Sequence, residues 1–273
     1  MTAAIVVLTD FFSVSNRALS YAAALAVPLE AHLVLLHVRH DGLLAPHEYG
    51  HRHAGRNLRA TQQALHSLAE SQPVPTQIEI SESFLPDAVA EAVRHHQPML
   101  LVLGRPGTAT APAEVVSSAA MDLLRQAPYP LLIVPTVGWD ADLPRRLVLA
   151  VDGAPFALCD NHLIVLRMLE KLNGTLKIVH VTDQRTTRHS APHILYTVQA
   201  GGLADHLATD QVEIVQGLAP VAGILQACSD FTGDLIVLIA RRHNLLSSLF
   251  HRSVTAQLLS ESPVPVLLLP SLD

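Results

Sequence analysis

Short apolar runs and longer polar-apolar stretches alternate along this chain. Runs such as residues 5–8 and 235–239 contain no polar residue, which is typical of strands that are covered on both faces. They predict strands over 3–9, 31–38, 76–81, 99–103, 131–134, 146–151, 175–181, 211–215, 234–239 and 265–269. The stretches between them predict helices over 15–27, 53–70, 86–95, 113–126, 155–172, 191–208, 219–230 and 248–261. Strands that alternate with helices predict an α/β fold with a parallel sheet.

The order of these elements occurs twice. Each half has a strand followed by Asp, a strand that ends in His-Val, a helix opened by Pro, and a Pro-x-Pro break before the last strand. These features begin at Asp10, His37, Pro86 and Pro128 in the first half, and at Asp152, His180, Pro220 and Pro263 in the second. A polar stretch over 137–145 separates the halves. We therefore expect two homologous domains, 1–138 and 145–273, each a doubly wound sheet of five parallel strands.

Composition narrows the function classes. The net charge is −6, which argues against a nucleic-acid partner. No apolar run reaches the roughly 18 residues of a membrane span, and no basic region followed by an apolar signal stretch opens the chain. Two cysteines do not make a disulfide framework. The expectation is a cytoplasmic protein with no membrane partner.

Candidate chemistry outside the repeat is sparse. The 16 histidines include His47 and His51, which one helical turn would place on the same face as metal ligands. No cysteine lies near them, and a polar surface helix explains them more simply. No Gly-x-Ser-x-Gly elbow and no phosphate loop with Lys is present. The sequence predicts no metal site and no catalytic residue.

Several segments in order resemble one family. They include Leu8-Thr9-Asp10-Phe11, Leu35-Leu36-His37-Val38, Gly104-x-x-Gly107, Asp152-Gly153, Ser253-Val254 and the two Pro-x-Pro breaks. The chain resembles a tandem-domain universal stress protein. The resemblance implies an adenine-nucleotide alpha-hydrolase-like fold, and an internal pseudo-dimer in which the domains pair through their last strands. Such pairing would cover apolar edge strands. A further homodimer is left open.

The resemblance also implies a nucleotide site in the first domain. Family members that bind ATP have Gly-x-x-Gly, nine residues, and then Gly-Ser or Gly-Thr, because glycines let backbone N–H groups approach phosphates. Here two glycines remain, a serine pair follows, and Pro106 removes one donor. Asp10 would hold a ribose hydroxyl, and the Val38 backbone would face adenine. The candidate residues for ATP or another adenine nucleotide are Thr9, Asp10, Val38, Gly104, Arg105, Gly107, Ser117 and Ser118. Alternatively, the glycines only form a turn and the serines only begin a helix.

The second domain departs further from that pattern. Ile239 and Arg242 replace the two glycines, and Arg252 replaces the third. We expect no ATP there in the family's usual mode. Side-chain cations could instead form an anion site, for which the candidates are Arg241, Arg242, Arg252 and Ser253. A solvated basic loop, or arginines that bond across the domain interface, are the simpler alternatives.

The resemblance thus implies a non-catalytic stress-response protein with a degenerate nucleotide site in domain 1 and a lost one in domain 2. Two alternatives remain open from the sequence. One is a weak ATP-hydrolysing enzyme that uses domain 1, and the other is an interaction module without a ligand.

Overall fold

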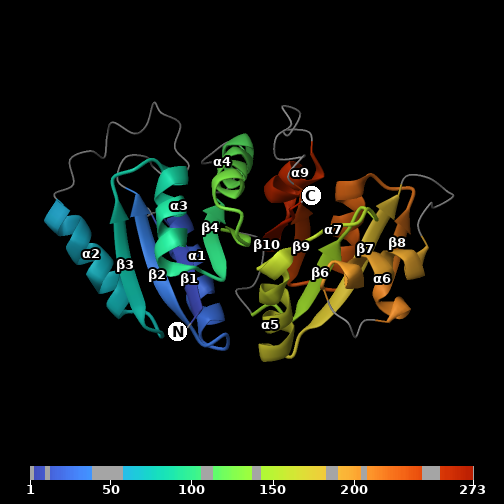
Figure 1. Ribbon diagram of the computed structural model, residues 1–273, viewed down its shortest axis with the longest axis horizontal. Helices are drawn as coiled ribbons and strands as arrows, with labels where there is room; N and C mark the ends of the chain where they lie inside the picture. The colour runs from blue at the N-terminus through green and yellow to red at the C-terminus, as the bar shows by residue number, and fades with distance from the viewer. Residues whose placement is uncertain are drawn as a thin grey trace. The chain divides into compact units, whose positions relative to one another are not determined.

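The chain folds into two compact units, Met1–Gly138 and Trp139–Asp273. The computed structural model describes residues 3–9, 13–38, 58–105, 113–136, 143–182, 190–203, 208–241 and 253–272 (Figure 1). Both units are α/β, with parallel strands and helices that alternate along the chain.

Unit 1 is a five-stranded parallel sheet in the order β3-β2-β1-β4-β5. Its elements are β1 (Ala3–Thr9), α1 (Ser13–Ala26), β2 (Ala31–Val38), α2 (Leu58–Glu70), β3 (Thr76–Ser81), α3 (Leu85–His96), β4 (Leu100–Arg105), α4 (Ala113–Gln126) and β5 (Leu131–Pro135).

Unit 2 repeats this plan in the order β8-β7-β6-β9-β10. Its strands are β6 (Arg146–Ala150), β7 (Thr175–Thr182), β8 (Val212–Gln216), β9 (Leu235–Ala240) and β10 (Val266–Pro270). Its helices are α5 (Leu163–Lys171), α6 (Ala191–Ala200), α7 (Pro220–Asp230) and α9 (Val254–Glu261), with 3-10 turns η2 (Cys159–His162) and η3 (Thr209–Gln211).

The strand registers of the two units are the same. Ile5 pairs with Leu33 and Leu100, and the equivalent Leu147 pairs with Leu176 and Leu235. Carrying this register to the strand ends gives the residue equivalences Thr9 to Val151, Val38 to Val181 and Gly104 to Ile239. The sequence repeat is therefore a structural repeat, and positions in one unit can be compared with those in the other.

The central strands of unit 1 are buried except at one end residue of each. Residues 4–8 and 100–103 are at most 1% exposed. Consecutive buried residues require cover on both faces of a sheet, because neighbouring side chains point in opposite directions. In unit 1, α1 packs on β1 and β4, while α3 packs on β2 and on α4. Figure 1 shows α3 in front of the sheet and α1 behind it. Each fully buried Val, Leu or Ile contributes roughly 1.5–3 kcal/mol.

Two predicted helices are shorter than expected. The helix predicted over 155–172 begins as α5 only at residue 163, after an irregular segment and η2. In that segment the carbonyls of Ala154 and Pro155 accept hydrogen bonds from Arg241 rather than from a helical turn. The helix predicted over 191–208 ends at residue 200, because Gly201 and Gly202 follow and Gly202 has a φ of 86°. Strand boundaries differ from the predicted ones by at most two residues.

Two further helix predictions extend beyond the described residues. The helix predicted over 53–70 is described from 58 onward as α2, and that predicted over 248–261 is described from 254 onward as α9. Among the described residues, no helix combines the length and the apolar character needed to cross a membrane.

Candidate functional site

A cavity of about 450 Å³ opens at the carboxyl ends of the unit 2 strands. It lies where β6 is flanked by β7 on one side and β9 on the other, and α7 and α9 complete it. In open parallel sheets, ligands bind at this point of reversed strand order. Its lining residues are Ala150, Val151, Asp152, Phe156, Val179, Val181, Pro220, Ile224, Leu238, Ile239, Arg241, Ser253, Val254 and Thr255.

The charged groups of this cavity are paired with each other. Asp152 follows β6 and Arg241 follows β9. The Arg241 Nη2 and Nε donate to the two carboxylate oxygens of Asp152 over 2.9 and 3.1 Å. The guanidinium also donates to the carbonyls of Ala154 at 2.8 Å and Pro155 at 2.7 Å. The Arg241 side chain is 7% exposed and that of Asp152 is 59% exposed, so a buried cation is neutralised by a carboxylate at the cavity mouth.

The rest of the lining is mainly apolar. Ile239 projects a side chain at the position equivalent to Gly104 of unit 1, and Phe156 packs against Gly201 so closely that an added Cβ would meet its ring at 2.2 Å. The Ser253 hydroxyl, at the start of α9, accepts a hydrogen bond from the backbone N–H of Ala256 at 3.1 Å. Ser253 therefore serves as the helix cap.

The corresponding edge of unit 1 has a different character. The hydroxyl of Thr9, at the end of β1, is buried and has no hydrogen-bond partner among the described residues. Gly104 supplies no side chain where unit 2 has Ile239. Burial lowers the pKa of Arg105, the last residue of β4, below its ordinary value, so a partly buried cation lies beside this edge.

One contact is common to both units. The Nδ1 of His37 lies 2.9 Å from the carbonyl oxygen of Thr9, and the Nδ1 of His180 lies 3.0 Å from that of Val151. A carbonyl oxygen only accepts, so Nδ1 carries the proton in both rings. Each histidine thus ties the end of the second strand of its unit to the end of the first. This repetition assigns both histidines to the fold rather than to one site.

Comparison with known proteins agrees with this geometry. The sequence model of the universal stress protein family matches residues 1–135 and again residues 144–270. The chain belongs to the universal stress protein family. A search of curated proteins returned no match.

Solved structures show the same fold over the whole chain. A universal stress protein from Archaeoglobus fulgidus DSM 4304 has a TM-score of 0.69 at 16% identity and covers 98% of both chains. A Pseudomonas aeruginosa PAO1 protein described as functionally unknown has a TM-score of 0.62 at 18% identity, over 99% of this chain and 93% of its own. At these identities the likeness concerns the fold, here of the adenine-nucleotide alpha-hydrolase-like type.

The structure brings together the unit 2 counterparts of the predicted site. Asp152, Val181, Ile239, Arg241 and Ser253 all line one cavity of this universal stress protein. In unit 1, the predicted residues that the structure describes with their side chains are Thr9, Val38, Gly104, Arg105 and Ser118.

Of the remaining candidate residues, the structure describes the side chain of Ser118 but not those of the others. Ser118 is exposed and lies inside α4, five residues after the start of the helix. Asp10, Gly107 and the side chain of Ser117 lie outside the described residues, as do Arg242 and Arg252. The nucleotide site and the anion site stay predictions. Arg241, a candidate for the anion site, is already paired with Asp152.

The sequence did not mark Phe156, Ile224 or Val254 as site candidates. Each falls inside a predicted helix, over 155–172, 219–230 and 248–261 respectively. A helical apolar pattern marks a residue as inward-facing but does not say whether it meets the sheet or a cavity.

The two histidines considered as metal ligands, His47 and His51, lie outside the described residues. Within them, no group of three or more His, Cys, Asp or Glu side chains is arranged to hold a metal ion. His47-Glu48-Tyr49-Gly50-His51 has the His-Glu-x-x-His spacing of zinc-binding helices and falls outside the described part of the chain. The prediction of no metal site therefore remains a prediction.

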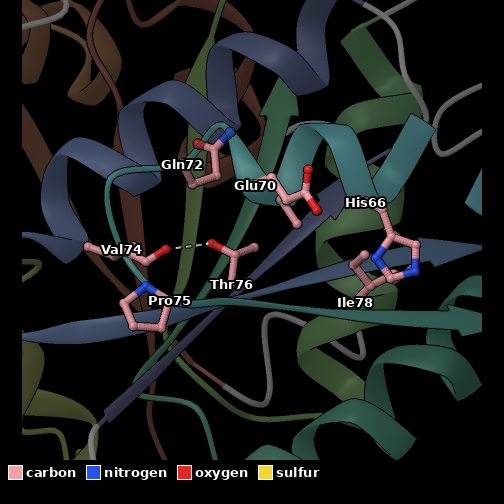
Figure 2. Close-up of a pocket in the computed structure, with 8 residues that line it drawn as sticks. His66, Glu70, Gln72, Val74, Pro75, Thr76 and Ile78 are labelled. Carbon is pink, nitrogen blue, oxygen red and sulfur yellow. Dashed lines mark hydrogen bonds between the residues drawn. The ribbon is translucent and has the colours of Figure 1, made fainter. Parts of the chain in front are cut away.

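A second hollow lies at the opposite end of the unit 1 sheet. Figure 2 shows it between the last turns of α2 and the beginning of β3, with His66 and Glu70 at one side and Thr76 in its floor. The Thr76 hydroxyl donates to the carbonyl of Val74 at 2.9 Å. This hollow is at the amino end of β3, away from the edge where the strands of the parallel sheet end.

Proposed function

We propose that this universal stress protein is a non-catalytic stress-response protein whose first unit binds an adenine nucleotide and whose second unit does not. The observation that carries the proposal is the contrast between two equivalent strand edges. Unit 1 has Gly104 at the end of β4, where unit 2 has the side chain of Ile239. A glycine at that position leaves room for a phosphate to approach the backbone.

The described residues of unit 1 fit a nucleotide in part. The hydroxyl of Thr9, which has no partner within the described part of the chain, suits a hydrogen-bonding ligand, because a buried polar group without a partner costs about 1–3 kcal/mol. The cation of Arg105 suits a phosphate. Together with Val38, Gly107, Ser117 and the ribose-binding role implied for Asp10, they make up the proposed site.

Unit 2 supports the other half of the proposal. Asp152, the counterpart of Asp10, is bonded to Arg241 through both carboxylate oxygens. Any ribose hydroxyl would have to compete with a buried guanidinium. The side chain of Ile239 occupies space that a phosphate needs.

Thermal unfolding with ATP, AMP and cyclic AMP tests the nucleotide site. A ligand at about 100 times its dissociation constant stabilises the folded state by roughly 2.7 kcal/mol, and we expect a rise in melting temperature with at least one nucleotide. The rise should vanish in Asp10→Ala and in Gly107→Val. It should persist in Asp122→Ala, which removes a carboxylate from the last turns of α4.

Measurement of ADP release separates the alternatives. A melting shift without turnover supports a binding protein, and turnover that is lost in Asp10→Ala would replace it by the weak ATP-hydrolysing enzyme. No shift with any nucleotide would leave the ligand-free interaction module. The cytoplasmic location stays a prediction from the sequence.

We also propose that the two units pair within one chain through β5 and β10. Two tandem family matches support this arrangement, and both strands are apolar over four consecutive residues, which makes an uncovered edge a liability. Sedimentation should give the mass of a single chain, 29.4 kDa, if these edges are satisfied internally. A dimer that dissociates when a proline replaces Leu132 or Leu268, in the middle of these strands, would indicate that the edges pair between chains instead.

A further inference from the structure

The unit 2 cavity has lost the features of a nucleotide site, yet the side chains of the described residues around it leave it open. It retains about 450 Å³, within the range of small-molecule sites. Its walls are formed by Phe156, Val179, Val181, Ile224, Leu238 and Ile239. A protein that merely abandoned a site would be expected to close it with side chains, because interiors are closely packed.

The charge balance of the cavity restricts what can enter. Arg241 and Asp152 cancel each other, so the pair offers neither a net positive site for phosphate nor a net negative site for an amine. Among the described lining residues a charged ligand would find no further counter-charge to replace its hydration, which is unfavourable in an apolar site. An uncharged ligand has no such penalty.

The walls are held in place by close contacts with glycines. The Val181 side chain lies against Gly223 of α7, where an added Cβ would meet it at 2.7 Å. Phe156 lies against Gly201 in the same way. Helix α7 and the segment after α6 therefore approach these two side chains as closely as packing allows. A preformed apolar wall binds a rigid ligand with little loss of conformational entropy.

We infer that the unit 2 cavity binds an uncharged, largely apolar small molecule, with the polar edge formed by Asp152, Ser253 and Thr255 available to one polar group of that ligand. This inference goes beyond the nucleotide proposal for unit 1 and does not depend on it. The two units of this chain would then recognise ligands of different chemistry at equivalent strand edges.

A matched pair of fluorescent probes tests the inference on the full chain. N-phenyl-1-naphthylamine is uncharged, and 8-anilinonaphthalene-1-sulfonate carries the same rings with a sulfonate. We expect the neutral probe to bind with a dissociation constant lower by about tenfold or more, because Arg241, the cation among the described lining residues, is already paired with Asp152. AMP should not displace the neutral probe, whether or not unit 1 binds nucleotide.

Two variants locate the probe. Ile224→Trp fills the cavity from α7, and Val254→Asp places a charge at its rim, where Val254 is 37% exposed. Each should weaken the neutral probe by about tenfold or more. The controls Gln226→Trp and Gln257→Asp make the same changes at exposed positions of α7 and α9 and should bind as the parent chain does. If Ile224→Trp fails to fold by circular dichroism, Val254→Asp still decides, because an acidic residue in the first turn suits the helix.

Three results would overturn the inference. Absence of neutral-probe binding to the parent chain removes its basis. Equal binding in the parent chain and in the cavity variants places the probe elsewhere. Tighter binding of the sulfonate than of the neutral probe would instead favour the anion site predicted around Arg241, Arg242 and Arg252.

Discussion

Asp152→Ala should be the more damaging of two changes at the buried ion pair, lowering the free energy of unfolding by about 3 kcal/mol. The reason is the unequal burial of the partners. Arg241 is 7% exposed and keeps its charge at any ordinary pH, so Asp152→Ala removes the carboxylate that neutralises a buried cation. The carbonyls of Ala154 and Pro155 would still accept hydrogen bonds from the guanidinium, but they carry no charge.

Arg241→Met should cost less, about 1 kcal/mol, because a methionine fills much of the same space and the mostly exposed Asp152 can hydrate. The double variant Asp152→Ala/Arg241→Met should be close to Arg241→Met alone, which would show that the two effects are not additive. Urea unfolding monitored by circular dichroism gives all three values. The exposed Arg145 offers a control, since Arg145→Met removes a guanidinium from the same unit and should change the stability little.

An Asp152→Ala variant as stable as the parent chain would contradict this account of the pair. So would additive effects of the two single changes. Either outcome would mean that the guanidinium is hydrated in solution, and the charge argument for an uncharged ligand would lose its support.

Asp234→Asn should lower the free energy of unfolding by about 2 kcal/mol at neutral pH. Asp234 lies just before β9 and joins it to the beginning of β6. Its carboxylate accepts from the backbone N–H groups of Arg145 and Arg146 at 3.1 and 3.0 Å, and from Nε and Nη2 of Arg146 at 3.3 and 2.8 Å. The side chain is 21% exposed, so water screens the pair in part and the effect stays below that of Asp152→Ala.

The pH dependence of this difference has a definite sign. Burial by itself raises the pKa of Asp234, but the hydrogen bonds from Arg146 and Arg145, with the charge of Arg146, outweigh it and hold the pKa below its usual value. A carboxyl whose pKa is lowered by folding stabilises the protein above its unfolded pKa of about 3.9 and loses that contribution as the pH falls through the folded value. The gap between parent and variant should therefore be constant near neutrality and shrink below roughly pH 4.

Asp230→Asn serves as the matched control for the pH series, since it removes an exposed carboxylate from the same unit at the end of α7. It should leave the pH profile of unfolding close to that of the parent chain. A gap between parent and Asp234→Asn that widens as the pH falls would reverse the sign and refute the assigned cause of the pKa shift.

The strands were predicted well because their signal is local. A buried parallel strand needs consecutive apolar residues, and short runs such as 5–8 and 235–239 are typical of such strands. The helix over 113–126 was predicted to the residue. The helix over 155–172 was not, because its beginning depends on hydrogen bonds from Arg241, which is about 85 residues away in the sequence. A local hydrophobic pattern carries no information about a hydrogen-bond donor so far away in the sequence.

For the cavity, too, some features could be predicted from local sequence and others depend on residues that are distant in the chain. From the sequence, Asp152, Ile239 and Arg241 could be assigned to one edge, because the ends of parallel strands meet there. The sequence could not say that Asp152 and Arg241 bind each other, and it left Arg241 as a candidate for an anion site, a solvated loop or a domain contact. Pairing is set by the approach of two strand ends to within hydrogen-bond distance, which depends on the packed sheet.

By itself, the sequence determined the architecture: two homologous α/β units, the order of their elements, and the loss of glycines in the second. Those features follow from apolar periodicity and from residue types that act locally. Only the tertiary structure decided the chemistry of the second edge, where a buried guanidinium neutralises the inherited carboxylate and an apolar cavity remains. Charge and burial are properties of the assembled strand ends, and they become defined only when residues distant in the chain are packed together.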